Sequence, residues 1–239
     1  MGCGLAIGME EARKALLPSP PARRLKDNAV SFGLALLSRP QPPRGVVTVS
    51  YEKLLLRYHN QKYRNKKSLP CSQVFQYRFN GSVDFARNFS DYENGFGSLL
   101  GEFWLGLKTV QEIVAQGRTE LRLDLTASGG KQAYEVFDNF RLGNAPDYTL
   151  HIDRGVGTAG DTVGSGLSYH NGMKFYTYDH DNTYSCAHNH GGGFWFNNCA
   201  VVNLNGQFVK SGDKGVIYYD FNSVKTLAST KMMMRRFTD

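Results

Sequence analysis

The decisive stretch of this chain reads Cys186-Ala-His-Asn-His-Gly-Gly-Gly-Phe-Trp-Phe-Asn-Asn-Cys199. It is preceded by the acidic turn Tyr178-Asp-His-Asp-Asn182. Two cysteines around a loop of glycines, aromatics and amides can form a disulfide, beside an oxygen cage for a hard cation such as calcium. The same stretch offers Cys186, His188, His190 and Cys199 as ligands of a zinc ion. Both interpretations are open at this point.

Composition divides the 239 residues at Pro70. Residues 1–70 carry 13 Lys and Arg against 4 Asp and Glu, a net charge of +9, and the rest of the chain carries −2, which gives the total of +7. Seven of the eight prolines also lie in this front segment. Basic, proline-rich sequence with few large apolar side chains does not offset the entropy of ordering, so residues 1–70 are predicted to be mostly disordered. A solvated tail is the simplest interpretation, and a specific nucleic-acid partner is not expected.

Membrane and export signals are not visible in the sequence. No run approaches the roughly 18 apolar residues that span a bilayer, so no membrane partner is expected. The first residues, Met1-Gly-Cys-Gly-Leu-Ala-Ile-Gly8, lack the basic start of a signal peptide, and Ala6 stands where a myristoylation motif has Ser or Thr.

Residues 71–239 show the pattern of a folded domain. The run Phe103–Ala115 has apolar side chains at steps of three and four, which predicts a helix. Short or alternating apolar runs predict strands at Gln73–Phe79, Glu120–Leu125, Ala133–Phe140, Tyr148–Ile152, Gly215–Tyr219 and Thr230–Arg235. Those between Glu120 and Ile152 are expected to form an antiparallel sheet. A sheet with one helix, followed by glycine-rich loops, predicts an α+β fold.

Enzyme motifs are weak or missing. Gly155-Val-Gly-Thr-Ala-Gly160 satisfies G-x-G-x-x-G, but a dinucleotide site needs a helix at that turn, and Asp161–Ser168 contains two more glycines and no apolar period. No nucleophile elbow, Walker sequence or His-Glu-x-x-His motif occurs, so no catalytic residues are assigned.

Seven motifs, in order along the chain, resemble the C-terminal globular domain of the fibrinogen family. This family includes ficolins, tachylectin-5-like lectins, angiopoietins and tenascins. The motifs are Phe79-Asn-Gly-Ser-Val-Asp-Phe85, Asn94-Gly-Phe-Gly97, Gly101-Glu-Phe-Trp-Leu-Gly-Leu107, Tyr134 with Phe137-Asp-Asn-Phe-Arg141, Leu167-Ser-Tyr-His-Asn-Gly-Met-Lys-Phe175, Asn203-Leu-Asn-Gly206 and Ser229-Thr-Lys-Met-Met232.

This resemblance implies a fold and a function. The fold would be a central antiparallel sheet over about 73–160 plus the closing strand, a packed helix, and a loop-rich binding subdomain over about 161–228. The function would be extracellular, non-catalytic recognition, as in calcium-dependent, lectin-like domains of innate immunity. Its ligand would be a carbohydrate, a glycoprotein or a protein. Cys186 and Cys199 would form the family's disulfide, which argues against zinc.

The resemblance also locates the candidate site. Phe194, Trp195, His190, Asn198 and Ala200 occupy its ligand pocket, and the rings of Phe194 and Trp195 could either stack on a sugar or pack the core. Asp181 matches a calcium ligand and Asp179 a neighbouring acid, so calcium is the implied cofactor.

Several departures from the family pattern weaken these expectations. Thr183 replaces a third acid and the loop before Cys186 is short, which predicts weakened calcium binding. Ala200 stands where family lectins have histidine. The small first subdomain has no counterpart in residues 1–70, so the domain is expected to be truncated, with Cys71 lacking its usual partner and Cys3 only a formal one.

Two hypotheses follow from the sequence. The first is a secreted recognition domain that uses the loops from Gly164 to Gly215. The alternative is a truncated structural or protein-interaction domain without a working sugar pocket. An oligomer is compatible with either, although no collagen-like repeat or long heptad is present to build one. The sequons Asn80-Gly-Ser82 and Asn88-Phe-Ser90 are glycan acceptors only if the chain enters the secretory route.

Overall fold

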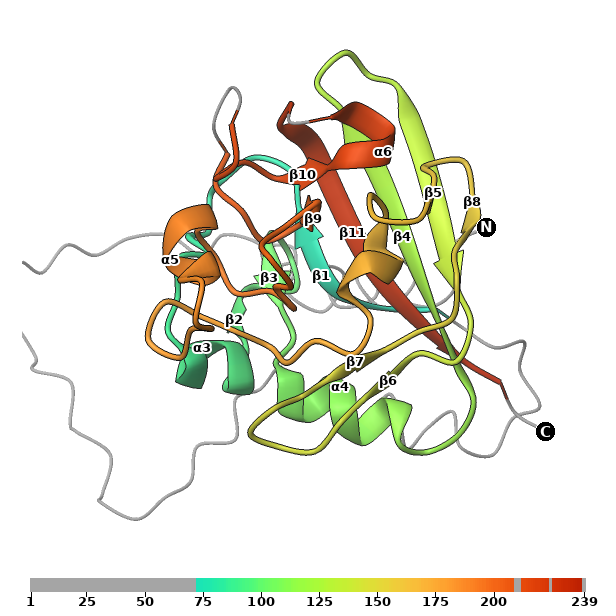
Figure 1. The fold of residues 1–239 in the computed structure, drawn as a ribbon. Coiled ribbons are helices and arrows are strands. Elements are labelled where there is room, and N and C mark those ends of the chain that lie inside the picture. The colour runs from blue at the N-terminus through green and yellow to red at the C-terminus, as the bar shows by residue number, and fades with distance from the viewer. Residues whose placement is uncertain (1–71, 209–211, 224, 238–239) are drawn as a thin grey trace, which may run out of the picture. The chain divides into compact units, whose positions relative to one another are not determined.

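Two long strands, β4 (Thr119–Ala127) and β11 (Leu227–Arg236), pair antiparallel and form the centre of the fold (Figure 1). The structure is a computed structural model that describes residues 72–208, 212–223 and 225–237. In β4, the leucines at 121, 123 and 125 are buried, whereas the polar residues between them are partly exposed. Successive side chains of a strand point to opposite faces, so the sequence alternation places one leucine face on the core.

Seven antiparallel strands form the main sheet, in the order β2-β3-β1-β11-β4-β5-β8. Its other strands are β1 (Gln73–Arg78), β2 (Phe96–Gly97), β3 (Phe103–Trp104), β5 (Gln132–Phe137) and β8 (Val156–Gly157). Separate pairs are formed by β6 (Arg141–Leu142) with β7 (Leu150–His151), and by β9 (Val202–Asn203) with β10 (Ile217–Tyr218). Strand β11 comes last in the chain but lies between β1 and β4, so the first and last described strands are neighbours.

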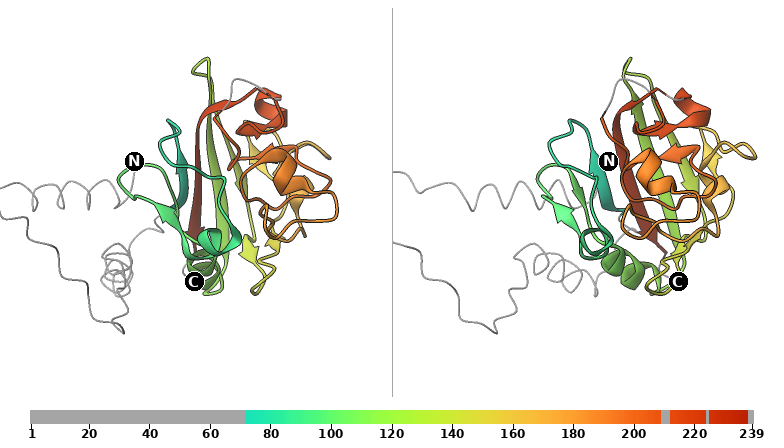
Figure 2. Two further views of the ribbon diagram at one scale, coloured as in Figure 1. Left: turned by 90° about the vertical axis from the view of Figure 1, so that its left-hand side faces the viewer. Right: turned by 60° about the vertical axis from the view of Figure 1, so that its left-hand side comes forward.

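The helices among the described residues are short. They are α3 (Phe89–Asn94), α4 (Leu107–Val114), the 3₁₀ turn η1 (Leu167–His170), α5 (Cys186–His190) and α6 (Tyr219–Asn222). Helix α4 lies at one end of the sheet and buries Leu107, Val110 and Val114. Figure 2 shows the orange segments with α5, and the red helix α6, gathered beside one face of the sheet that contains the red strand β11. We call residues 161–226 the loop part of the domain.

Aromatic side chains connect the sheet to the loop part. The Trp104 ring centroid, from β3, lies 5.8 Å from that of Phe175 and 6.3 Å from that of Trp195. Tyr92 of α3 lies 5.5 Å from Trp104. All four side chains are fully or almost fully buried. Because large aromatic side chains bury much apolar area, this cluster stabilises the contact between the two parts.

The structure confirms the predicted α+β fold and corrects two elements. The strand expected over Tyr148–Ile152 is limited to β7 and lies outside the main sheet. The helix expected to start at Phe103 starts at Leu107 instead. Phe103 and Trp104 form β3 and pair with Tyr77 and Gln76 of β1. Gly106, with a φ of 102°, turns the chain between strand and helix in a conformation that L side chains rarely adopt. Strand β3 has only two residues, so the sequence contains no alternation of apolar and polar side chains that would predict it.

The structure also bears on the glycine motif at Gly155–Gly160 and on membrane-spanning helices. Within Gly155–Gly160, residues 156 and 157 form the edge strand β8, so the expected glycine-rich surface loop contains a short strand and no nucleotide-binding helix starts there. Among the described residues, no helix has the length and apolarity that a membrane-spanning segment needs. The predictions for residues 1–70, Cys3 and Cys71 lie outside the described residues.

Candidate functional site

A disulfide closes the loop of glycines, aromatics and amides that follows the acidic turn. Cys186 and Cys199 are bonded, with Cα atoms 5.3 Å apart. Cys186 is fully buried at the start of α5, and Cys199 is partly exposed. Because both sulfurs are bonded to each other, neither is a thiolate available to zinc, and the zinc alternative loses two of its four ligands.

The carboxylate of Asp181 holds the start of α5. Its Oδ1 accepts hydrogen bonds from the backbone N–H groups of Asn182 (2.8 Å) and Ala187 (3.0 Å), and its Oδ2 accepts one from His188 (2.9 Å). A helix leaves its first N–H groups without intrahelical partners, and an acidic side chain at this end satisfies them. Asn182 adds to the cap, because its Oδ1 accepts from the N–H of Cys186 at 3.2 Å.

Asp179 joins the acidic turn to α3. Its Oδ1 accepts from the N–H of Phe89, at 2.9 Å, and from the hydroxyl of Thr177, at 2.7 Å. Phe89 is the first residue of α3, so this bond crosses ninety positions of sequence. The His180 ring lies beside the same residue, with centroids 4.9 Å apart.

As arranged, these two carboxylates do not fit a calcium ion. Calcium takes six to eight oxygen ligands, whereas both oxygens of Asp181 and one of Asp179 already accept protein hydrogen bonds. Within the described part of the chain, no three His, Cys, Asp or Glu side chains converge as a metal site. The observed role of the turn is to bind backbone N–H groups, as Asp side chains do in local turns.

Phe194 and Trp195 belong to the core. Neither side chain has exposed surface. The indole Nε1 of Trp195 donates to the carbonyl of Tyr148 at 2.8 Å, and its ring contacts Phe175 edge-on at 5.1 Å. Of the two roles that the sequence left open for these rings, this placement favours core packing, because a side chain without exposed surface offers no face to a sugar. The aromatic residues could serve either role in the sequence, and only the fold distinguishes them.

The other three expected pocket residues lie closer to the surface. His190 is partly exposed, and its Nδ1 lies 2.9 Å from the carbonyl of Asp213. Asn198 is exposed, and its carbonyl accepts from the hydroxyl of Tyr169 at 3.2 Å. Ala200 is partly buried against the core. The structure therefore spreads the five residues over core and surface and does not bring them together in one pocket.

Several exposed residues near the disulfide lie outside the ligand pocket that the family resemblance implies. Tyr178 and Tyr184 have exposed fractions of 52% and 58%, and His180, His188 and Asn189 are also exposed. Asn189 reaches back to the carbonyl of Tyr184. We define the loop surface as these five residues with Asn198. A usable signal was in the sequence: residues 175–209 contain no Lys, Arg or Glu.

His170 fastens the base of the stapled loop. It is fully buried, with Nδ1 2.8 Å from the Trp195 carbonyl and Nε2 3.2 Å from the Val202 N–H. Nε2 must therefore accept and Nδ1 must donate, which is the neutral ring. Burial lowers the pKa of His170 to about 4, against the opposing effect of its bond to Trp195. The histidine thus ties together the chain before and after the disulfide.

Three acidic residues fix the segment between Gly155 and Ser168, where the chain passes from β8 into the loop part. Glu135 of β5 accepts from the N–H groups of Ala159 and Gly160, and burial raises its pKa. Asp161 accepts from the N–H groups of Gly155 and Ser168. Asp220 of α6 accepts from Thr162 and Ser165, and these bonds outweigh burial, so its pKa is lowered. These contacts are structural, because each carboxylate is used by a neighbouring loop.

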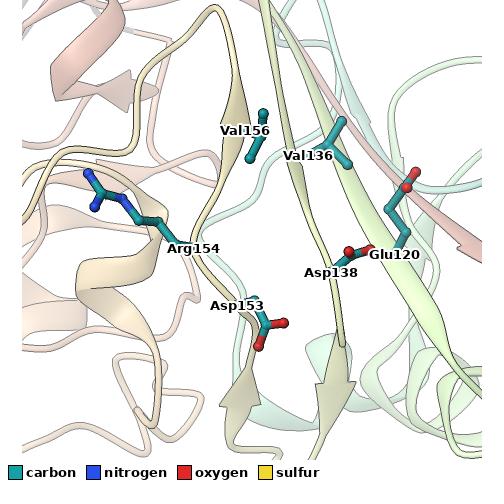
Figure 3. A pocket seen from close by; sticks show the side chains of 6 residues that line it. All are labelled: Glu120, Val136, Asp138, Asp153, Arg154 and Val156. Atoms are coloured by element: carbon teal, nitrogen blue, oxygen red, sulfur yellow. The ribbon is translucent and has the colours of Figure 1, made fainter.

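A shallow depression lies elsewhere, at the β8 edge of the sheet (Figure 3). Its carboxylates already have partners: Glu120 pairs with Arg235 at 2.7 Å, Asp138 with Arg118 at 3.3 Å, and Asp153 accepts from Asn139. The Arg154 side chain extends away from them in Figure 3. The depression therefore does not present a free acidic cluster, and the loop surface remains the better candidate.

Comparison with known proteins now identifies the class. Residues 70–237 match the family of the C-terminal globular domain of fibrinogen beta and gamma chains. The chain belongs to this family, whose members are typically extracellular and bind ligands, generally without catalysis.

Individual relatives agree with this assignment. Tenascin-R of Gallus gallus is 39% identical over 170 residues, which cover 69% of this chain and 12% of that protein. Fibrinogen-like protein A of Apostichopus parvimensis is 38% identical over 155 residues, 62% of this chain and 54% of that protein. The chain thus corresponds to only part of these proteins.

Solved structures show the same fold. The fibrinogen-like globe domain of human ANGPTL6 has a TM-score of 0.66 at 33% identity, over 71% of this chain and 79% of that one. Lamprey fibrin D-dimer, solved with the peptide ligand Gly-His-Arg-Pro-amide, has a TM-score of 0.63 at 29% identity, over 70% of this chain and 62% of that one.

Proposed function

We propose that this domain is an extracellular recognition domain that binds a protein or glycoprotein through the loop surface. The observation that carries the proposal is the composition of that surface. Lys, Arg and Glu are missing from residues 175–209, while Tyr178 and Tyr184 are more than half exposed among histidines and amides. Protein-binding surfaces are enriched in aromatic residues and depleted in Lys and Glu, because tyrosine offers a large contact area at little entropic cost.

Rigidity of the scaffold supports the same function. The loop surface is held from below by the disulfide, by the Asp181 cap of α5 and by the bond from Asp179 to Phe89. Ordering a flexible loop on binding costs free energy, and a loop that is already ordered avoids that cost. The peptide ligand of the lamprey fibrin structure is a precedent within the family for recognition of a protein segment.

Recognition of a single sugar in an enclosed pocket is less well supported than contact between the loop surface and a protein or glycoprotein. Phe194 and Trp195, the aromatic residues expected to stack on a sugar, are buried, and Ala200 offers only a methyl group. These observations favour the second candidate, a protein-interaction domain without a sugar pocket, over a lectin that recognises a single monosaccharide.

An array of extracellular glycoproteins and free glycans, probed with the purified chain, tests the proposal. We expect retention on at least one glycoprotein or protein, and a loss of at least tenfold in affinity for Tyr184→Ala, as for a central aromatic contact. Tyr134→Ala is the matched control, because Tyr134 is also an exposed tyrosine (38%) but lies on the outer face of β5.

Three results separate the hypotheses. Binding that Tyr184→Ala leaves unchanged would show that the loop surface is not the site. Retention on free glycans alone would favour a lectin, and no retention on any spot would favour a purely structural domain.

A further inference from the structure

We propose that Asn80 carries an N-linked glycan in the secreted protein and that Asn88, the second sequon asparagine, does not. The inference rests on the extracellular location in the proposed function, since the sugar is transferred only in the secretory route. Asn80-Gly81-Ser82 and Asn88-Phe89-Ser90 both match the acceptor motif Asn-x-Ser, so the sequence does not distinguish them. The structure places them in very different surroundings.

The turn that contains Asn80 is fixed from the inside. Glu102 is fully buried, and its Oε1 accepts from the N–H groups of Phe79 (2.7 Å), Asn80 (2.8 Å) and Gly81 (2.9 Å). Its Oε2 accepts from Val83 at 2.9 Å. Burial alone would raise the pKa of Glu102, but these four donors outweigh it and hold the pKa below its usual value. The backbone N–H groups of this turn therefore point inward to the Glu102 carboxylate, which fixes the conformation of the turn.

The side chain of Asn80, which would accept the glycan, lies on the solvent side of the turn. Asn80 and Ser82 are both exposed. The Oδ1 of Asn80 accepts from the Ser82 N–H at 3.0 Å, whereas its Nδ2 donates to no other described residue. A glycan on Nδ2 would leave every hydrogen bond of the turn in place. Surface loops are where such acceptors are found.

An aromatic neighbour adds to the fit. Phe79, directly before Asn80, is 39% exposed and packs on Tyr77 with ring centroids 4.8 Å apart. The apolar face of a sugar ring can pack on an exposed aromatic side chain. The first sugar would therefore cover the exposed apolar surface of Phe79 beside the turn.

Asn88 is placed differently. It is partly buried and is the N-cap of α3, with Oδ1 accepting from the Asp91 N–H at 2.8 Å. Its neighbour Phe89 is bound by Asp179 and contacts His180. A glycan at Asn88 would have to lie where α3 meets the acidic turn. A folded, secreted domain is expected to carry none there.

The chemical step is a simple displacement. The Nδ2 of Asn80 attacks the anomeric carbon of an oligosaccharide linked to a lipid diphosphate, which is the co-reactant. A C–N bond forms, the C–O bond to the diphosphate breaks, the lipid diphosphate leaves, and Nδ2 loses one proton. Nothing is oxidised or reduced.

Secretion of the full chain behind a cleavable signal peptide tests the proposal. Peptide-N-glycosidase F should shift the mobility of the secreted protein and convert Asn80 to Asp, which mass spectrometry reads directly. Asn80→Gln should abolish the shift, and Asn88→Gln, the matched control, should keep it. Ser82→Ala should act like Asn80→Gln while it leaves the asparagine in place.

Translation of the same variants with microsomes covers the case in which one fails to fold. There the wild-type chain should carry one glycan more than Asn80→Gln, whether or not the product is secreted. An unmodified Asn80 in translocated protein, or a glycan on Asn88 in secreted protein, would overturn the proposal. Neither readout uses ligand binding, so a glycosylated chain that binds nothing would contradict only the proposed function.

Discussion

The sheet and the loop part of this domain are stabilised in different ways. In β4 and β11, backbone ladders and alternating apolar side chains hold nine and ten residues in regular strands. In the described residues of the loop part, regular structure is limited to two-residue strands and helices of five residues or fewer. There, side chains such as Asp181, His170 and Asn205 bind backbone groups directly. Both parts bury apolar side chains, but the loop part depends in addition on particular hydrogen bonds and one disulfide.

This difference explains the glycine run before Phe194. Asn205 donates to the Gly193 carbonyl at 2.8 Å and also accepts from Gln76 of β1, so it links the loop to the sheet. A Cβ on Gly192 would collide with the Asn205 carbonyl, and Gly192 has a φ of +73°. The loop can approach the Asn205 backbone this closely only because Gly192 has no side chain.

The largest effect is expected in the sheet. Leu123→Ala should lower the free energy of unfolding by about 4 kcal/mol, because the side chain has no exposed surface and leaves a cavity beneath the central strands. Urea unfolding followed by circular dichroism measures it. Asp124→Ala, on the opposite face of β4, is the control and should change stability by about 0.5 kcal/mol or less. Equal losses would mean that packing does not dominate the sheet.

The disulfide should have the next largest effect. Replacing Cys186 and Cys199 by serine should lower the free energy of unfolding by about 3 kcal/mol, because the unfolded chain is no longer constrained. Hydrogen exchange should show where the loss occurs: amides of α5 should exchange faster relative to those of β4. Equal acceleration in both would show that the staple supports the whole domain and not the loop part alone.

The sheet could be predicted because its cause is local. The leucines of β4 alternate within six residues, and the structure has them buried as expected. Strand β3 and helix α3 were missed because two residues show no period, and because the N-cap Asn88 is recognised only once the helix is known.

The candidate site could be predicted only in part, because its interactions join distant residues. The disulfide followed from the family resemblance, whereas the bond from Asp179 to Phe89 has no local pattern. The burial of Trp195 depends on Tyr148 and Trp104, which lie far away in sequence. The exposed tyrosines could have been found from the missing Lys, Arg and Glu, but their exposure required the fold.

Acid should weaken the loop part through His170. Its folded pKa of about 4 lies below the ordinary value of 6.5, so the fold favours the neutral ring. The stabilisation is complete above pH 6.5 and is lost as the pH falls through 4, with about 2 kcal/mol lost at pH 5. Unfolding at pH 7 and pH 5 measures this. His170→Gln should remove that part of the pH dependence, whereas replacing the exposed His151 should not.

Calcium should have the smallest effect. To bind it, Asp181 would have to release N–H groups of α5, so the cost of opening the cap offsets the gain in coordination. With a dissociation constant near 1 mM, at the weak end for extracellular modules, 1 mM calcium would add about 0.4 kcal/mol of stability. Thermal unfolding with calcium and with a chelator measures this. Asp181→Ala should destabilise the domain in both buffers. A large shift with calcium that Asp181→Ala abolishes would show that the turn rearranges into a metal site, and that the loop part has a second stable arrangement which the sheet lacks.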